Sequence, residues 1–260
     1  VRGGLFYMGK PVIDMLVVGL PVNTVENYHT ALSQRLVGKH QIPVMARDAD
    51  QLYVPSGATT DVEVRAVKVV PQPIGALFDF SISNNLFSRM RSQMNLVIDP
   101  GYYTLDWVVA QGIKVNGARS GAQPGGMSSV LGAMAESISQ RIGVQITDVS
   151  AIDDAIRTGQ KPRFFGKELD IADQILLGKE KARQFVNVLA TKVGNQGVDI
   201  DNIIIGGGGA EFFRDVIQEK FPNHSLIMTN DPVFSNVRGF QLAGVQWANQ
   251  AAYAQRKATT

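Results

Sequence analysis

The sequence contains no cysteine. This absence excludes disulfides, thiol nucleophiles and cysteine metal sites, and it agrees with a reducing compartment. The three histidines, His29, His40 and His224, are far apart in the chain, so a zinc centre is not expected. No Ser-His-Asp order and no HExxH helix is found either. The sequence therefore gives no sign of those hydrolase chemistries.

Runs of like charge and long apolar runs are also missing. Lys and Arg total 25, Asp and Glu total 23, and the two signs are interspersed. The positive field that holds a nucleic-acid backbone is absent, so no direct nucleic-acid partner is expected. No apolar run reaches the ~18 residues of a membrane span, and the N-terminus lacks the order of a signal peptide. We therefore expect a cytoplasmic protein with no membrane partner.

The composition that remains is that of a folded protein. The chain has 260 residues, of which 45% are apolar and 18% charged. At the usual ~150 residues per domain, this length predicts one large domain or two modest ones with a substantial core. The first residue is Val1 rather than Met, and an apolar stretch follows closely, so we expect a fragment.

The hydrophobic pattern predicts strands that lead into helices, and hairpins that lead into helices. This order indicates an α/β chain with mixed sheets, and a change of character near residue 93 predicts a domain boundary. Expected strands cover residues 12–20, 61–70, 202–205 and 226–228, with hairpins at 37–60 and 96–110 and a turn-like segment at 115–124. Expected helices cover residues 23–36, 74–90, 127–142, 148–157, 168–194, the segment after residue 209, and 237–256.

Three turns each follow an apolar strand: Pro71-Gln72-Pro73, Asp99-Pro100-Gly101 and Gly206–Gly209. In open α/β sheets, ligands lie beyond the strand ends, where such loops converge. The pattern predicts that these turns share one cleft.

The glycine tetrad and the Asp99 turn each have a ligand-binding interpretation and a structural one, whereas Gln72 alone indicates very little. Glycines let the backbone approach a base or phosphate, and the following helix N-terminus offers free amides, but a tight strand-to-helix turn needs no ligand. Asp99 can hold magnesium through water, or it can bond to amides of its own turn. Thr104 and Asp106 can pair across the hairpin or cap the turn, and Asp106 is expected to have a structural or supporting role. The tetrad Gly206–Gly209 matches neither G-x-G-x-x-G nor the P-loop pattern.

Taken in order, these motifs resemble those of the actin-like ATPases, most closely the plasmid-segregation branch typified by ParM (StbA). The segment VIDPGYYTLDWVV is similar to the second phosphate loop of that family, D-x-G-x-x-T-x-D, with Asp99, Gly101, Thr104 and Asp106 at the matching positions. NIIIGGGGAEFF is similar to the family's adenosine motif, and VKVVPQPIGA is similar to its first connecting segment. IDMLVVGLPV resembles the strand that carries a Leu-Pro pair in this family. MTNDPVFSNVRGFQLAG resembles the closing segment, in which an Asn-x-x-Gly leads into the last helix. The similarity spans residues 12 to about 250.

The resemblance implies a ribonuclease-H-like actin/ParM fold with mixed sheets flanked by helices. Residues 1–92 would be the remainder of the first half, 93–234 the second half, and 235–260 a C-terminal helix that returns to the first half. The family's first phosphate loop, an Asp-x-Gly hairpin, has no match before Asp99, so the resemblance implies a chain truncated at its N-terminus. A second departure is that Tyr102 and Tyr103 stand where relatives carry small residues, which would narrow or redirect the phosphate pocket.

The resemblance also implies the site. ATP or GTP would bind with magnesium, which Asp99 would hold through water, and Gln72 would orient the attacking water. Gln72 and Asp99 are thus the catalytic residues. The nucleotide-binding residues would be Gly101, Tyr102, Thr104, Gly125, Gly126, Gly206, Gly207, Gly208, Gly209 and Ala210, with Gly125 and Gly126 on the ribose side.

The function implied is slow, magnesium-dependent ATP hydrolysis by the full-length protein, with the fragment itself inactive. The protein would self-associate into filaments or dimers and segregate plasmid DNA through a DNA-bound adaptor protein. The alternative is a nucleotide-binding scaffold that forms no filaments, as in pilus-assembly relatives. A sugar or acetate kinase ranks last, because no catalytic Asp of an acceptor pocket is evident.

Overall fold

The computed structural model describes residues 2–194 and 197–258. The chain forms two compact units. Unit 1 comprises Val1–Leu20, Thr24–Val70 and Phe240–Thr260, and unit 2 comprises Pro21–Asn23 and Pro71–Gly239. None of the helices described combines the length and the apolar character needed to cross a lipid bilayer.

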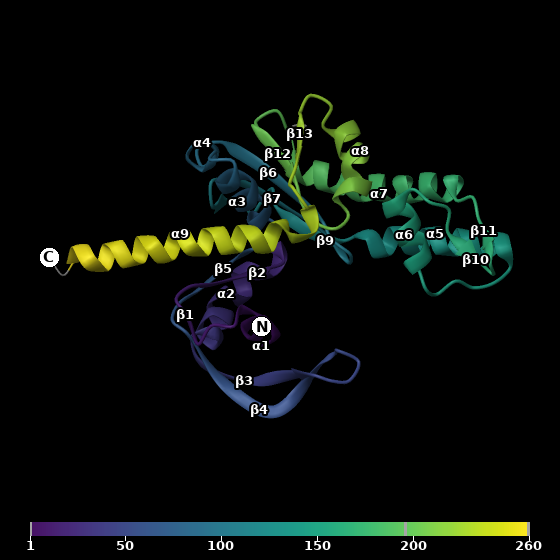
Figure 1. The fold of residues 1–260 in the computed structure, drawn as a ribbon. Helices are drawn as coiled ribbons and strands as arrows, with labels where there is room; N and C mark the ends of the chain where they lie inside the picture. Colours follow the sequence, from purple (N-terminus) through teal and green to yellow (C-terminus); the bar gives the residue numbers. More distant parts are fainter. Residues whose placement is uncertain (1, 195–196, 259–260) are drawn as a thin grey trace. The chain divides into compact units, whose positions relative to one another are not determined.

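Unit 2 is built on a mixed sheet of six strands in the order β13-β12-β6-β7-β8, with β9 also paired to β7 (Figure 1). The strands are β6 (Met94–Pro100), β7 (Thr104–Gln111), β8 (Lys114–Val115), β9 (Gly121–Pro124), β12 (Asn202–Ile205) and β13 (Leu226–Met228). β12 is parallel to β6 and to β13, whereas β7 is antiparallel to β6. The register pairs Ile98 with Ile205, so β6 and β12 end side by side.

Helices cover this sheet because its strands are apolar on both faces. Leu96, Ile98 and Ile205 belong to a core formed with α5 (Met127–Ile142), α7 (Ala172–Val193) and α8 (Ala210–Lys220). The intervening Val97 and Ile204 are equally buried. The helix α3 (Ile74–Ser83) also packs on β6 and β12. The helices α4 (Phe87–Met90) and α6 (Ser150–Thr158), the strands β10 (Arg163–Phe164) and β11 (Lys167–Glu168), and the 3-10 helix η2 (Pro232–Phe234) complete the unit.

Unit 1 contains a two-stranded sheet, β2-β5, and a three-stranded sheet, β1-β4-β3. Its elements are α1 (Arg2–Met8), β1 (Val12–Ile13), β2 (Leu16–Leu20), α2 (Val22–Leu36), β3 (Gly38–Arg47), β4 (Tyr53–Val64) and β5 (Val67–Pro71). Its core includes Leu5, Leu16, Leu36, Ile42 and Val62. The final helix, α9 (Ser235–Ala258), begins among the residues of unit 2 and continues from Phe240 among those of unit 1.

Most expected elements are confirmed, and the differences come from contacts with other elements. The expected strand 12–20 is split into β1 and β2 at Asp14-Met15, and each part pairs with a different strand. The turn-like segment 115–124 contains β9, whose Gly121 lies against the Trp107 ring at a distance that leaves no room for a Cβ. The residue 93 expected as a domain boundary falls inside unit 2, where α3 packs on β6 and β12.

Candidate functional site

Asp99 lies near the end of β6, and only 3% of its surface is exposed. Its Oδ2 accepts hydrogen bonds from Gln72 Nε2 at 3.2 Å and from Asn236 Nδ2 at 2.7 Å. Both donors are far from Asp99 in the sequence. Its carboxylate is thus not bonded to amides of its own turn, which was the structural interpretation of this residue.

A second carboxyl group lies beside it. Asp106 on β7 is the cross-strand partner of Asp99 and is also buried. Its Oδ2 accepts a hydrogen bond from Thr104 Oγ1 at 2.6 Å, and its Oδ1 accepts one from the backbone N–H of Val22 at 3.4 Å. Thr104 therefore bonds along its own strand to Asp106 and does not cap the turn. The structural or supporting role expected for Asp106 stays a prediction.

Burial raises the pKa of Asp99 to about 6, and the neighbouring charge of Asp106 adds to the effect, whereas the two amide donors oppose it. Burial also raises the pKa of Asp106, against the bonds from Thr104 and Val22. A cation placed at this pair would favour the ionised form of both groups. Both buried carboxyl groups would therefore gain from a bound cation.

The glycine tetrad lies directly against Asp99. Gly206 N donates to Ile98 O at 3.0 Å, and Gly209 N donates to Pro100 O at 2.7 Å. Gly207 has a φ of +83°, and a Cβ at this position would lie 2.1 Å from Asp99 Oδ1. Only glycine fits there, for both conformation and space. The tetrad and the Asp-Pro-Gly bend, which the sequence predicted to meet, are therefore in contact.

The segment from Pro232 to Asn236, which includes the first two residues of α9, completes this contact, and the sequence prediction of site residues missed it. Gly207 N donates to Pro232 O at 2.8 Å, and Ser235 Oγ donates to the same carbonyl at 2.9 Å. Ser235 is fully buried against Gly206, where a Cβ would lie 2.6 Å from its Oγ. Asn236, the first residue of the Asn-x-x-Gly motif, bonds to Asp99. That motif was the available signal, but its spacing alone did not reveal the partner of Asn236.

The other predicted residues surround the bend of the β6–β7 hairpin. Met127 N donates to Gly101 O at 3.0 Å, and Ser128 N donates to Tyr102 O at 2.7 Å, so the start of α5 is bonded to this bend. A Cβ on Gly126 would lie 2.4 Å from Gly101 O, and one on Gly125 would lie 2.7 Å from the Phe185 ring. These two glycines permit close packing here, and their place on the ribose side stays a prediction.

The rings of Tyr102 and Tyr103 are 49% and 74% exposed and pack edge to face at 4.8 Å between centroids. The narrowing of a phosphate pocket by these rings stays a prediction.

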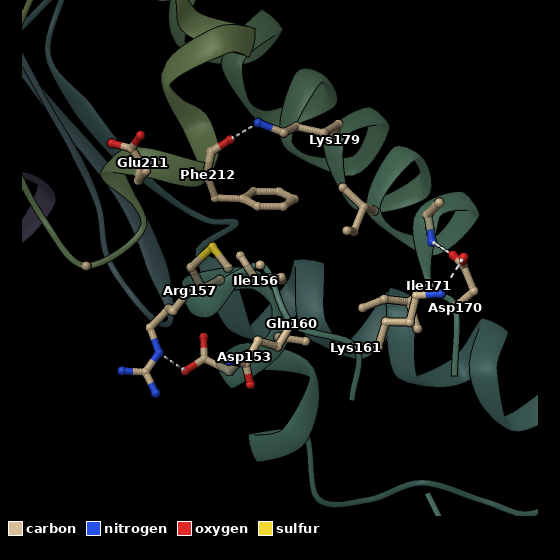
Figure 2. Close-up of a pocket in the computed structure, with 16 residues that line it drawn as sticks. Asp153, Ile156, Arg157, Gln160, Lys161, Asp170, Ile171, Lys179, Glu211 and Phe212 are labelled. Carbon is tan, nitrogen blue, oxygen red and sulfur yellow. Dashed lines mark hydrogen bonds and ion pairs between the residues drawn. The ribbon is translucent and has the colours of Figure 1, made fainter. Parts of the chain in front are cut away.

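A cavity of about 530 Å³ opens beside the tetrad (Figure 2). Gly208, Glu211 and Phe212 border it at the start of α8, opposite residues of α6 and the beginning of α7. Phe212 lies under the Lys179 amine, which is 4.7 Å from the ring centroid and donates to Phe212 O at 2.6 Å. The remaining lining residues are Met127, Asp153, Ala155, Ile156, Arg157, Gly159, Gln160, Lys161, Asp170, Ile171, Ala172 and Ile175.

This cavity is lined by apolar side chains, such as Ile156 and Phe212, and by charged ones, such as Asp153 and Lys161. Such a combination is typical of small-molecule and cofactor sites. Ala210 begins α8 next to the cavity, so the positive end of an eleven-residue helix borders it as well. None of the lining residues except Gly208 was among the predicted ones, because α6, α7 and α8 meet there only in the folded chain.

The residues also fit a magnesium ion that bridges to phosphate. Magnesium typically takes one or two protein carboxylates together with waters and phosphate oxygens. Asp99 and Asp106 supply two such groups, and in the part of the chain that the structure describes no cluster of three or more metal-binding side chains exists. Such an ion would depend on a phosphate ligand as well as on this pair.

Two family models match the chain. The model of the C-terminal part of archaeal actin homologues that resemble MreB matches residues 97–219, and the model of the N-terminal domain of actin-like proteins matches residues 1–75. A comparison with curated proteins found no match.

Solved structures give the same fold. A non-polymerisable quadruple mutant of pCBH ParM is 21% identical, with a TM-score of 0.67 over 88% of this chain and 67% of that one. The archaeal actin homologue Ta0583 in complex with ADP is 17% identical, with a TM-score of 0.75 over 94% of this chain and 76% of that one. A 15-stranded ParM filament from Clostridium botulinum is 20% identical, with a TM-score of 0.67 over 88% of this chain and 66% of that one.

The chain therefore has the actin-like ATPase fold. Solved ParM structures, from the branch that the sequence motifs resemble, share this fold.

Proposed function

We propose that this protein binds a nucleoside triphosphate with magnesium at the contact between Asp99 and the glycine tetrad. The observation that carries the proposal is this contact itself. Gly209 N donates a hydrogen bond to Pro100 O, and Gly207 lies so close to Asp99 that a Cβ would not fit. Buried carboxylates at one end and an apolar cavity at the other match the two ends of a nucleotide, which are the metal-bound phosphates and the base. ATP and GTP are both candidates.

Hydrolysis is the proposed reaction, and the positions of three side chains support it. Phosphoryl transfer depends mainly on positioning and on charge stabilisation. Asp99 and Asp106 would hold magnesium through its waters, and the ion would neutralise phosphate charge. Gln72 lies within 3.2 Å of Asp99, which is close enough for its amide to orient a water beside the same phosphates. An amide cannot take up the proton as a carboxylate can, so we expect slow turnover.

Self-association into filaments is the second part of the proposal. The shared fold and the filament structure of the relative from Clostridium botulinum support it. The finer proposal is segregation of plasmid DNA through an adaptor protein. It rests on the similarity of the motifs to those of ParM.

A single set of measurements tests both parts on the native protein. Magnesium and ATP, or GTP, should produce phosphate release together with a rise in light scattering and a sedimentable polymer. The Gln72→Ala variant should bind nucleotide as the wild type does but release phosphate at least about tenfold more slowly. Absence of nucleotide binding would refute the site, and binding without any polymer would refute the filament.

The alternative is a nucleotide-binding scaffold that forms no filaments. The exposed pair Tyr102 and Tyr103 favours it, because bulky rings beside the phosphate loop can suppress turnover. Phosphate release separates the two candidates. Equal, negligible rates for the wild type and Gln72→Ala, with nucleotide bound, would identify a scaffold.

A further inference from the structure

Asn236 is the second residue of α9, and both ends of its amide are bonded. Its Nδ2 donates to Asp99 Oδ2 at 2.7 Å, and its Oδ1 accepts from the backbone N–H of Ala76 at 3.1 Å. We propose that Asn236 is the positioning residue of this site, which holds the Asp99 carboxylate so that Oδ1 stays directed at the tetrad. The inference rests on the proposed nucleotide site and adds a role that the motif comparison did not assign.

The bond from Ala76 fixes which way the amide points. A backbone N–H can only donate, so the atom facing Ala76 is the oxygen, and the NH₂ group must face Asp99. A reversed amide would place two acceptors against each other at Asp99 and two donors against each other at Ala76. The carboxylate is thus held by a donor that cannot rotate away without losing two hydrogen bonds.

Gln72 contacts the same Asp99 oxygen but is held differently. Its Nε2 is 3.2 Å from Oδ2, and among the described residues no second side-chain bond fixes this amide. Gln72 can therefore turn toward a water while Asn236 keeps Asp99 in place. This arrangement separates the two tasks of holding the carboxylate and orienting the nucleophile.

The start of α9 is itself rigidly seated. A Cβ on Gly239 would lie 1.8 Å from Gly75 O, so this turn packs on the backbone of α3 without any side chain between them. Arg238 adds two bonds to the buried carboxylate of Asp79, at 3.2 and 2.9 Å. Ser235 packs against Gly206 on the other side. Contacts on both sides of Asn236 thus hold it at a fixed distance from Asp99.

The experiment compares Asn236→Ala and Asn236→Asp with the wild type in the native protein. Asn236→Ala removes the donor, and Asn236→Asp keeps the shape and the bond from Ala76 but places a carboxylate against Asp99. The matched control is Asn187→Ala, an exposed asparagine on α7. Thermal melting identifies the variants that fold. If Asn236→Ala does not fold, the comparison is made with Asn236→Asp.

Two readouts are expected to move. Phosphate release should show a kcat at least about tenfold lower for Asn236→Ala, with KM for nucleotide within about threefold of the wild type, because the misplaced group acts on the reaction more than on binding. Fluorescence titration of ADP with and without magnesium should show that the ion improves the wild-type affinity and improves that of both variants at least about threefold less. This second readout needs no turnover.

The outcomes separate the inference from the proposed function. A folded Asn236→Ala variant with wild-type kcat and the wild-type gain from magnesium would overturn the inference alone. Equal losses of kcat and of ADP affinity without magnesium would also overturn it, because they indicate a general structural defect. A wild-type protein that binds no nucleotide would overturn the proposed function, and the inference with it.

Discussion

Asp99 and Asp106 face each other directly across the β6–β7 hairpin, and both carboxyl groups are buried. The antiparallel register of β6 and β7 pairs these two residues, although they are seven positions apart in the chain. The Pro100-Gly101 bend between them fixes this register. Two like charges held together without a counter-ion destabilise a fold, so a cation bound at this pair would stabilise the protein.

Replacement of Asp99 by Asn should stabilise the unliganded protein at neutral pH. The pKa of Asp99 is about 6 in the folded state and 3.8 as the ordinary value, so the folded protein binds more protons between these pH values. Its free energy of unfolding therefore falls as pH rises from about 4 to 6 and stays lower above this range, by about 2–3 kcal/mol. Thermal melting at pH 4 and pH 7.5 should show a higher Tm for Asp99→Asn only at the higher pH.

The control for this prediction is Asp61→Asn, which changes an exposed carboxylate. Equal gains in stability for both variants at pH 7.5 would indicate a general charge effect and contradict the argument from burial. Asp99→Asn should also lose the improvement of nucleotide affinity by magnesium, so removal of the ion with EDTA should leave its affinity unchanged.

Gly207→Ala and Gly208→Ala should differ strongly although the residues are neighbours. Gly207 has a left-handed φ, and a Cβ there would collide with Asp99 Oδ1 and Pro100 O, whereas a Cβ on Gly208 would meet nothing within 4 Å. Chemical denaturation should show a loss of about 2–4 kcal/mol for Gly207→Ala and of about 0.5 kcal/mol or less for Gly208→Ala. Similar losses of unfolding free energy for both variants would show that Gly207 is not closely packed against Asp99.

Arg238→Ala should destabilise the protein because it leaves the buried carboxylate of Asp79 without its cation. Asp79 is 5% exposed, and the Arg238 side chain is 35% exposed, so part of the interaction is screened by solvent. We expect a loss of about 2–3 kcal/mol in the free energy of unfolding, below the full cost of breaking a buried pair. Denaturant titration measures it.

The control is Arg65→Ala, which breaks the exposed pair with Asp14. It should cost about 1 kcal/mol or less. A result in which the two arginines contribute equally would contradict the role assigned to the start of α9.

Ala172→Trp should block nucleotide binding with little effect on folding. Ala172 is exposed and lines the cavity beside the tetrad, so a large ring there would fill the proposed base pocket. The affinity for ADP should fall at least about tenfold, because a base and an indole cannot occupy the same space. Leu176→Trp, on the same helix but outside the cavity, should bind ADP as the wild type does. Unchanged ADP affinity in Ala172→Trp would move the base pocket elsewhere.

The secondary structure could be predicted where the pattern is strong. The sequence predicts the strand of Leu96–Ile98, the amphipathic helix α5 and the strand-glycine-helix unit around Gly206, because the spacing of apolar residues follows their burial. The splitting of residues 12–20 and the strand β9 could not be predicted, because pairing with other strands decides both.

By itself, the sequence determined the chemistry that this protein has available. It excludes cysteine chemistry and provides the apolar strands. It also places Asp99, Gln72 and the four glycines that allow close backbone approach at the ends of those strands. Only the tertiary structure decided which groups meet: Asn236 with Asp99, Gly207 with Pro232, and α6 with α8 around one cavity. The physical reason is that side-chain type and local conformation depend on nearby residues. Contacts between segments that are separated in the sequence depend on how the strands and helices are arranged around the sheet.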